Sequence, residues 1–131
     1  MTALPELIDT DTGEVVSAVQ WNALEQTISL TALRNPSRSH GARLIHRNEP
    51  MRVVYWAEDS TGQAVYVGAT ASGTKLRGRV REHIGKQTRF GKWLVQNPEA
   101  TLHFISFPDR ATTFRVEREM IALKRPVFNE R

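Results

Sequence analysis

The chain has 131 residues, which is enough for one domain with a hydrophobic core and too few for two domains of ordinary size. Its hydrophobic fraction of 40% and charged fraction of 24% are those of a soluble globular protein, and no apolar run reaches the roughly 20 residues of a membrane span. The absence of cysteine excludes disulfides and cysteine-ligated zinc, and the net charge of +4 favours a polyanionic partner. Because the N-terminus lacks a basic segment followed by an apolar core, we expect a cytoplasmic protein.

Acidic and basic residues are separated along the chain. Residues 1 to 32 contain acidic residues and no lysine or arginine, whereas between residues 75 and 92 the lysines and arginines are accompanied only by Glu82. Such a basic stretch is either an ordinary solvated face or a surface that binds nucleic acid.

Residues 1 to 50 are expected to form an N-terminal extension. Apolar residues from Trp21 to Ile28 have helical spacing, which predicts an amphipathic helix over about 17 to 33. Its acidic character argues against contact with phosphate, and favours packing on the domain, shielding of the basic surface or binding of a protein partner. Residues 35 to 41 have the composition of a loop flanked by arginines, so they form either a flexible basic arm or a solvated connector.

Two short segments are rich in β-branched and aromatic residues and are predicted to be strands. They run from Arg52 to Ala57 and from Ala64 to Gly68, and the polar turn between them indicates a β-hairpin. Each strand carries one tyrosine, and the sequence leaves open whether the two rings share a face. Gly68 ends the second strand, where its lack of a side chain allows backbone or ligand to approach closely.

The basic stretch is predicted to begin a helix near Leu76, because apolar residues recur there at every fourth position. Arg79 and His83 lie on one edge of this apolar stripe, and Arg77 and Arg81 lie beyond the other. A permanent cation and a titratable imidazole are therefore one turn apart at the border of the core. The stripe consists of Leu76, Val80 and Ile84, and Thr74 is the predicted N-cap.

Three further elements complete the domain from residue 51 to 131. A short helix through Phe90 and Trp93 ends at Asn97-Pro98, and a third strand is expected over 101 to 107. Asp109 is expected to cap a last helix over about 111 to 124.

Glu117 is the unusual residue of that last helix. It falls on one face with Phe114 and Ile121, and an acid on an apolar stripe needs a reason. Either it pairs with a neighbouring arginine, or it occupies a cleft where a carboxylate binds a metal ion.

The ordered set of these residues resembles the GIY-YIG nuclease family over about residues 51 to 130. Val53-Val54-Tyr55 and Tyr66-Val67-Gly68 stand for the two strand signatures, with Val53 in place of the first glycine and Val67 in place of an isoleucine. The arginine and histidine of the basic helix, the glutamate of the last helix and an asparagine near the C-terminus follow in the family's order. The residues that carry the resemblance are Tyr55, Tyr66, Arg79, His83, Glu117 and Asn129.

The resemblance implies an α/β fold with a small three-stranded antiparallel sheet flanked by helices, and a metal-dependent DNA endonuclease. Glu117 would bind one Mg²⁺ or Mn²⁺, and Arg79 would contact the phosphate oxygens. Tyr55 would act as general base, with its proton drawn off by the metal environment or by His83. Tyr66 would orient the scissile phosphate, and Asn129 would hold the site.

DNA is expected to bind mainly through its phosphate backbone. Alternatives within the same fold are a catalytically silent nucleic-acid-binding module and a protein-interaction domain. A chain with one active site that cuts both strands would most simply dimerise, so a homodimer is a further expectation. The predicted backbone contacts are Lys75, Arg77, Arg81, Lys86, Arg89 and Lys92.

Overall fold

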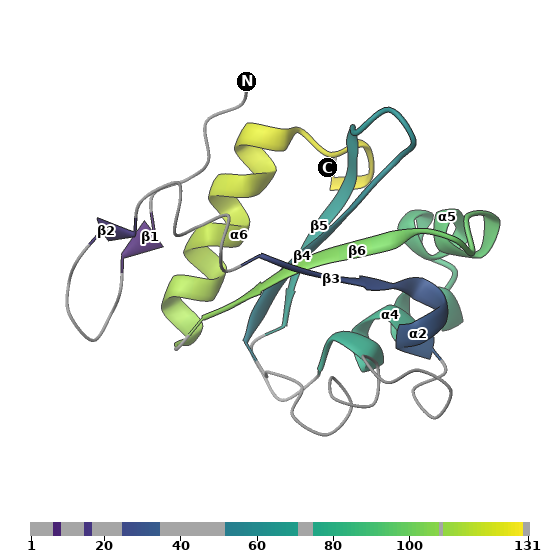
Figure 1. Ribbon diagram of the computed structural model, residues 1–131, viewed down its shortest axis with the longest axis horizontal. Coiled ribbons are helices and arrows are strands. Elements are labelled where there is room, and N and C mark those ends of the chain that lie inside the picture. The colour runs from purple at the N-terminus through teal and green to yellow at the C-terminus, as the bar shows by residue number, and fades with distance from the viewer. Residues whose placement is uncertain are drawn as a thin grey trace.

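The computed structural model contains a four-stranded antiparallel sheet with helices on both of its faces (Figure 1). The strand order is β3-β6-β4-β5, so β4 and β6 are central and β3 and β5 are the edges. None of the helices within the described ranges is long and apolar enough to cross a membrane. The structure describes residues 7–8, 15–16, 25–34, 52–70, 75–107 and 109–129.

Strands and helices are interspersed along the chain. The strands of the sheet are β3 (Gln26–Ser29), β4 (Val53–Glu58), β5 (Ala64–Thr70) and β6 (Thr101–Ser106). The helices are α2 (Leu30–Arg34), α4 (Leu76–Gly85), α5 (Arg89–Gln96) and α6 (Arg110–Lys124), followed by a 3-10 turn, η2 (Val127–Asn129). A separate two-stranded ribbon pairs β1 (Leu7–Ile8) with β2 (Val15–Val16).

The expected sheet of three strands is wrong in strand number, because residues 26 to 29 form a fourth strand. β3 pairs antiparallel with β6, and Ile28 lies opposite Leu102. The helix expected over 17 to 33 is therefore wrong for these residues, and only α2 at its end is helical. Pairing with the free edge of β6 outweighs a helical spacing of three apolar residues, which is a weak local signal. Residues 17 to 24 of that prediction lie outside the described residues, as does the proposed basic arm at 35 to 41.

The strands alternate between two hydrophobic cores, one on each face of the sheet. Tyr55 of β4 and Phe104 of β6 belong to the core beneath α2, α4 and α5, and Trp56 and Ile105 belong to the core beneath α6. Leu30 and Leu33 of α2 are both about 1% exposed in the first core. The alternative that the N-terminal segment packs on the domain is thus confirmed for residues 25 to 34.

The predicted hairpin of β4 and β5 is confirmed, and its turn has the expected chemistry. The Asp59 carboxylate accepts hydrogen bonds from the backbone N–H groups of Thr61 and Gln63, at 2.9 Å and 3.1 Å. The Thr61 hydroxyl donates to the same carboxylate at 2.5 Å, and this bond, followed by the backbone bond from Thr61, lowers the pKa of Asp59. Gly62 has a φ of +85°, a conformation that glycine adopts readily.

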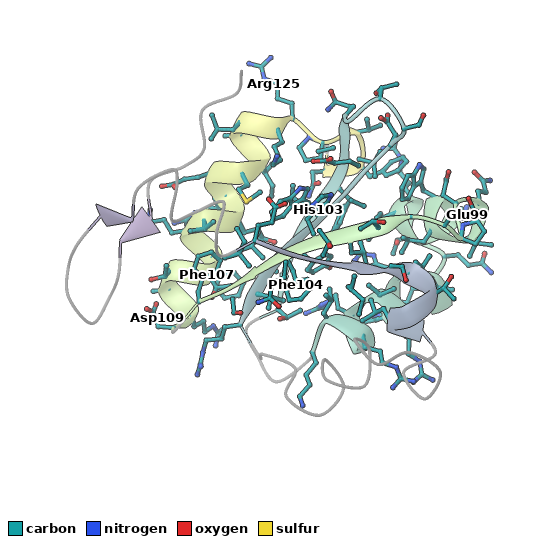
Figure 2. All side chains as sticks on the ribbon, in the orientation of Figure 1. Glu99, His103, Phe104, Phe107, Asp109 and Arg125 are labelled. Carbon is teal, nitrogen blue, oxygen red and sulfur yellow. The ribbon has the colours of Figure 1, made fainter. Side chains whose placement is uncertain are left out.

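Helix α6 begins with the N-cap that the sequence predicted and ends at the expected residue, Lys124. Asp109 caps its first turn by accepting from the Thr112 N–H at 2.7 Å, and Arg125 follows the last turn in a left-handed conformation. Figure 2 shows these two residues at the two ends of the helix. The buried face runs through Val116 and Met120 and not through the predicted stripe. Glu117 therefore lies at the border of the core, half-buried.

Candidate active site

The two strand tyrosines share a face of the sheet, which the sequence left open. Tyr55 lies directly opposite Gly68, and Tyr66 lies opposite Ala57, so the two rings are diagonal neighbours with centroids 6.2 Å apart. A Cβ atom on Gly68 would be 2.5 Å from both Cζ and the hydroxyl oxygen of Tyr55. The close approach that glycine permits here is therefore that of the Tyr55 ring.

Gly68→Ala is expected to destabilise the protein by about 1 to 3 kcal/mol, because the added methyl overlaps the buried Tyr55 ring. Urea denaturation of the wild type and the variant measures this difference. The matched control is Gly85→Ala, since a Cβ at Gly85 meets nothing within 4 Å. Equal loss of stability in both variants would contradict the proposed packing of Tyr55 on Gly68.

His83 of α4 lies against both tyrosines. Its Nε2 is 3.5 Å from the Tyr55 hydroxyl, and its ring meets Tyr66 edge-on at a centroid distance of 5.0 Å. Its other nitrogen, Nδ1, is 2.8 Å from Oγ1 of Thr88, and Phe90 of α5 packs on the same ring at 5.2 Å. The imidazole is thus fixed on three sides by β4, β5 and the start of α5.

Arg79 lies one turn before His83 on α4, and its guanidinium has hydrogen-bond donors both with and without a partner in the described part of the chain. Nη1 forms an ion pair with Glu82 at 3.5 Å, while the buried Nε has no hydrogen-bond partner among the described residues. Arg79, His83 and Thr88 line a small pocket of about 150 Å³ together with Glu82 and Lys86. A guanidinium with an unused buried donor is suited to an incoming oxyanion.

Glu117 contributes a carboxylate without a direct partner. Within the described part of the chain it makes no hydrogen bond or ion pair, and the nearby Arg115 pairs with Glu119 instead. Burial raises the pKa of Glu117, and the positive charge of Arg79 partly opposes this. The alternative that Glu117 pairs with a neighbouring arginine is not what the described residues show.

Glu117 supplies the kind of oxygen ligand that a hard divalent cation accepts. Mg²⁺ binds through one or two carboxylates, and retains water molecules that substrate phosphates can replace. The described residues contain no group of three or more His, Asp or Glu side chains able to hold a metal ion. A cation here would therefore have Glu117 as its carboxylate ligand, half-buried and unpaired.

The ionisable groups of this cluster have shifted pKa values. Burial, followed by the neighbouring Tyr66, raises the pKa of Tyr55 well above 10.0, and burial followed by Glu117 raises the pKa of Tyr66. Burial, followed by Arg79, lowers the pKa of His83 from 6.5. At neutral pH both phenols keep their protons and the imidazole is uncharged, so His83 is the group ready to accept a proton.

Asn129 lies at the edge of the sheet, and its polar atoms bind the backbone of β5 and not the tyrosine hydroxyls. Its side chain accepts from the Val67 N–H at 2.8 Å and donates to the Val67 carbonyl at 2.9 Å. The oxygen and the NH₂ group of the side-chain amide are thereby both used, and they satisfy backbone groups on the outer edge of β5. Asn129 therefore holds in place the strand that carries Tyr66.

Helix α4 separates two sets of arginines. Arg77 and Arg81 line a groove of about 420 Å³ between α4 and α2, on the side away from the pocket of Arg79. Other predicted backbone contacts have partners within the domain: Lys86 pairs with Glu82 at 2.8 Å, and the Arg89 guanidinium lies over the Phe128 ring. Lys75 occupies the N-cap position of α4, without a side-chain cap, and Lys92 is exposed on α5. The prediction of Thr74 as the cap is therefore wrong by one residue, and Thr74 itself lies outside the described residues.

His103 lies outside this cluster. It stacks on Trp56 at 5.2 Å, and its two nitrogens are 3.1 Å from Glu25 and 3.6 Å from Glu58. It is a packed histidine that links β6 to both neighbouring segments.

Sequence reasoning missed Thr88, whose hydroxyl contacts His83. The signal that would have found it is a threonine directly before a helical apolar pattern, which is an N-cap signature.

No protein-family model, curated protein or solved structure matches this chain. Functional assignment therefore rests on the geometry of the site.

Proposed function

We propose that this protein is a divalent-metal-dependent endonuclease that hydrolyses phosphodiester bonds in DNA. One observation carries the proposal: Tyr55, Tyr66, Arg79, His83 and the unpaired Glu117 form one cluster, although they come from β4, β5, α4 and α6. Their order along the chain is that of the GIY-YIG nucleases. If core packing alone had brought these side chains together, it would not explain why the half-buried Glu117 carboxylate has no partner among the described residues.

Each side chain supplies a task that phosphodiester hydrolysis needs. Arg79 donates to the non-bridging oxygens of the scissile phosphate, where negative charge grows in the transition state. Tyr66, half-buried beside Tyr55, orients that phosphate through its hydroxyl. Glu117 holds the cation, which when bound provides Lewis-acid stabilisation of the phosphate charge.

The proton of the attacking water leaves through Tyr55. Because burial keeps the Tyr55 phenol protonated, Tyr55 accepts a proton only as it passes its own to another group. His83 Nε2 lies 3.5 Å from the hydroxyl and is uncharged at neutral pH, which makes it the acceptor. Of the two routes left open by the sequence, this geometry favours the imidazole.

The second candidate is a nucleic-acid-binding module without turnover. The groove lined by Arg77 and Arg81 favours it, because this groove lies apart from the pocket of Arg79 and needs no catalysis to bind a phosphate backbone. Both candidates bind DNA, and only the first cleaves it.

The deciding experiment incubates supercoiled plasmid with the purified full chain in Mg²⁺ or Mn²⁺. We expect nicked or linear products with either metal and none in EDTA. A parallel panel of single-stranded, duplex and branched DNA, with cut sites mapped, identifies the substrate. Binding without cleavage across the panel and both metals would favour the binding module.

Removing charge from either side of α4 is expected to have opposite effects. Arg77→Ala combined with Arg81→Ala should weaken DNA binding and lower the salt dependence by about two counterions, with little change in cleavage rate at saturation. Arg79→Ala should lower the rate about 10²-fold and change affinity little. Fluorescence anisotropy at several salt concentrations and single-turnover cleavage measure the two quantities.

The matched control for the double variant is Arg52→Ala with Arg110→Ala, which removes the same charge from two exposed positions. It should weaken binding less than the Arg77 and Arg81 double variant. Equal weakening by both pairs would mean that net charge alone drives binding and that the α2/α4 groove is not the DNA surface.

A further inference from the structure

We propose that Thr88 is a positioning residue that holds His83 in the tautomer with its proton on Nδ1, leaving Nε2 free to accept a proton from Tyr55. The tautomer is inferred from the contacts on both sides of the imidazole, and its catalytic consequence rests on the proposed nuclease function. Thr88 contacts no substrate atom in this scheme, and it acts only through His83.

The corner between α4 and α5 places Thr88 beneath the imidazole. Gln87, with a φ of +53°, turns the chain, and the Thr88 backbone N–H donates to the His83 carbonyl at 3.2 Å. Gly91 packs directly against that carbonyl, at a distance no side chain would permit. These contacts fix the end of α4 against the start of α5, so the Thr88 hydroxyl and the imidazole keep one relative position.

The Thr88 oxygen has two roles at once. As the N-cap of α5 it accepts from the Gly91 N–H at 3.0 Å, and it lies 2.8 Å from His83 Nδ1. A hydroxyl oxygen offers two acceptor positions, so with Nδ1 protonated it accepts from both N–H groups. Its own proton faces the His83 carbonyl oxygen, 3.5 Å away.

The contact on the opposite side of the ring agrees with the same tautomer. The Tyr55 side chain is only 1% exposed, and a buried hydroxyl needs an acceptor for its proton. With Nδ1 protonated, Nε2 presents a lone pair to that hydroxyl at 3.5 Å. With Nε2 protonated, Nε2–H would donate to the phenol oxygen and His83 would be unable to receive the phenol proton.

The chain of contacts therefore runs from Gly91 through Thr88 and His83 to Tyr55. Each contact determines which atom of the next group carries the proton, as in sites where a second group orients a functional histidine. Thr88 replaces the carboxylate or carbonyl commonly found in that position. Because a threonine hydroxyl is uncharged, it fixes the tautomer without adding a negative charge that would favour the imidazolium.

Long-range ¹⁵N–¹H correlation spectra of the ¹⁵N-labelled full chain at neutral pH test the proposal. We expect the Nδ1–H pattern for His83 in the wild type and in Thr88→Ser, which keeps the hydroxyl. Thr88→Val removes the hydroxyl and should give a mixture of tautomers. His83→Gln assigns the signal by its disappearance.

Loss of the N-cap also lowers stability in Thr88→Val, so a control with equal cap loss is needed. Asp109→Ala removes the cap of α6 and should lower the melting temperature comparably, while the His83 spectrum stays that of the wild type. On the substrate that the wild type cleaves, Thr88→Val should cut about 10-fold to 100-fold more slowly, and Thr88→Ser should recover most of the rate.

An Nε2–H pattern in the wild type would overturn the proposal, whether or not any variant folds. An unchanged His83 spectrum in a folded Thr88→Val would overturn it equally. If no DNA is cleaved under any condition but the tautomer depends on Thr88 as expected, the nuclease function fails while the positioning of His83 by Thr88 stands.

Discussion

Glu117→Gln is expected to lower the rate of DNA cleavage by about 10³-fold or more, because it removes the proposed carboxylate ligand of the metal while keeping the shape of the side chain. The comparison is single-turnover cleavage by both proteins at saturating DNA and Mg²⁺. Glu119→Gln on the same helix is the matched control, since that residue pairs with Arg115 outside the cluster. Equal nicking by wild type and Glu117→Gln would remove Glu117 from the mechanism.

The same substitution is expected to stabilise the fold at neutral pH. The folded protein raises the pKa of Glu117 above 4.5, so the stabilising contribution of the protonated form is complete below 4.5 and is lost as pH rises through the folded pKa. Above that pKa the ionised carboxylate is held half-buried, without a direct partner in the described part of the chain. Urea denaturation should therefore show Glu117→Gln more stable than wild type at pH 7, with the difference disappearing near pH 4.

A gain in stability with a loss of cleavage is the signature of a residue kept for function at the expense of folding. A half-buried glutamate without a role in catalysis would show the gain in stability but not the loss of cleavage. A lower stability of Glu117→Gln at pH 7 would mean that the carboxylate has a stabilising partner, and would contradict the unpaired state.

Tyr55→Phe is expected to lower the cleavage rate by about 10²-fold to 10⁴-fold, the range for loss of a general base. The ring remains packed on Gly68, so the free energy of unfolding should change by only about 1 kcal/mol, the size of one hydrogen bond. Single-turnover rates and urea denaturation measure the two effects. A rate close to that of the wild type would exclude Tyr55 from proton transfer.

The pH profile provides an independent check on the partner of Tyr55. Because proton transfer needs the uncharged imidazole and burial lowers the pKa of His83, the wild-type rate should rise with pH through an inflection below 6.5 and then level off. The charged and titratable groups near His83 are Tyr55, Tyr66, Arg79, Glu82 and Lys86. In Tyr55→Phe this inflection should disappear from the residual activity.

Local patterns predicted most of the elements that surround the site. The hairpin follows from two β-branched segments around an Asp and Gly turn, and α4 follows from an apolar residue at every fourth position. The N-cap of α6 at Asp109 was also predicted correctly. Each of these features depends on residues that are close together in the sequence, so it can be predicted from the sequence alone.

The N-terminal strand was missed because its cause is not local. Residues 26 to 29 are a strand since β6 offers them an unpaired edge, more than 70 residues further along the chain. A helical spacing of three apolar residues carried no information about that edge. The same reason explains why the number of strands was too low by one.

The sequence by itself determined which residues are available for chemistry and which elements carry them, from the strand tyrosines to the acid on the last helix. Only the tertiary structure decided that Tyr55 and Tyr66 share a face, that Glu117 has no direct partner within the described residues, and that Thr88 contacts His83. These features depend on strand register and on the packing of α4, α5 and α6 around the sheet. Register and packing are set by contacts between distant segments, such as the one that joins Tyr55 to His83 across 28 residues.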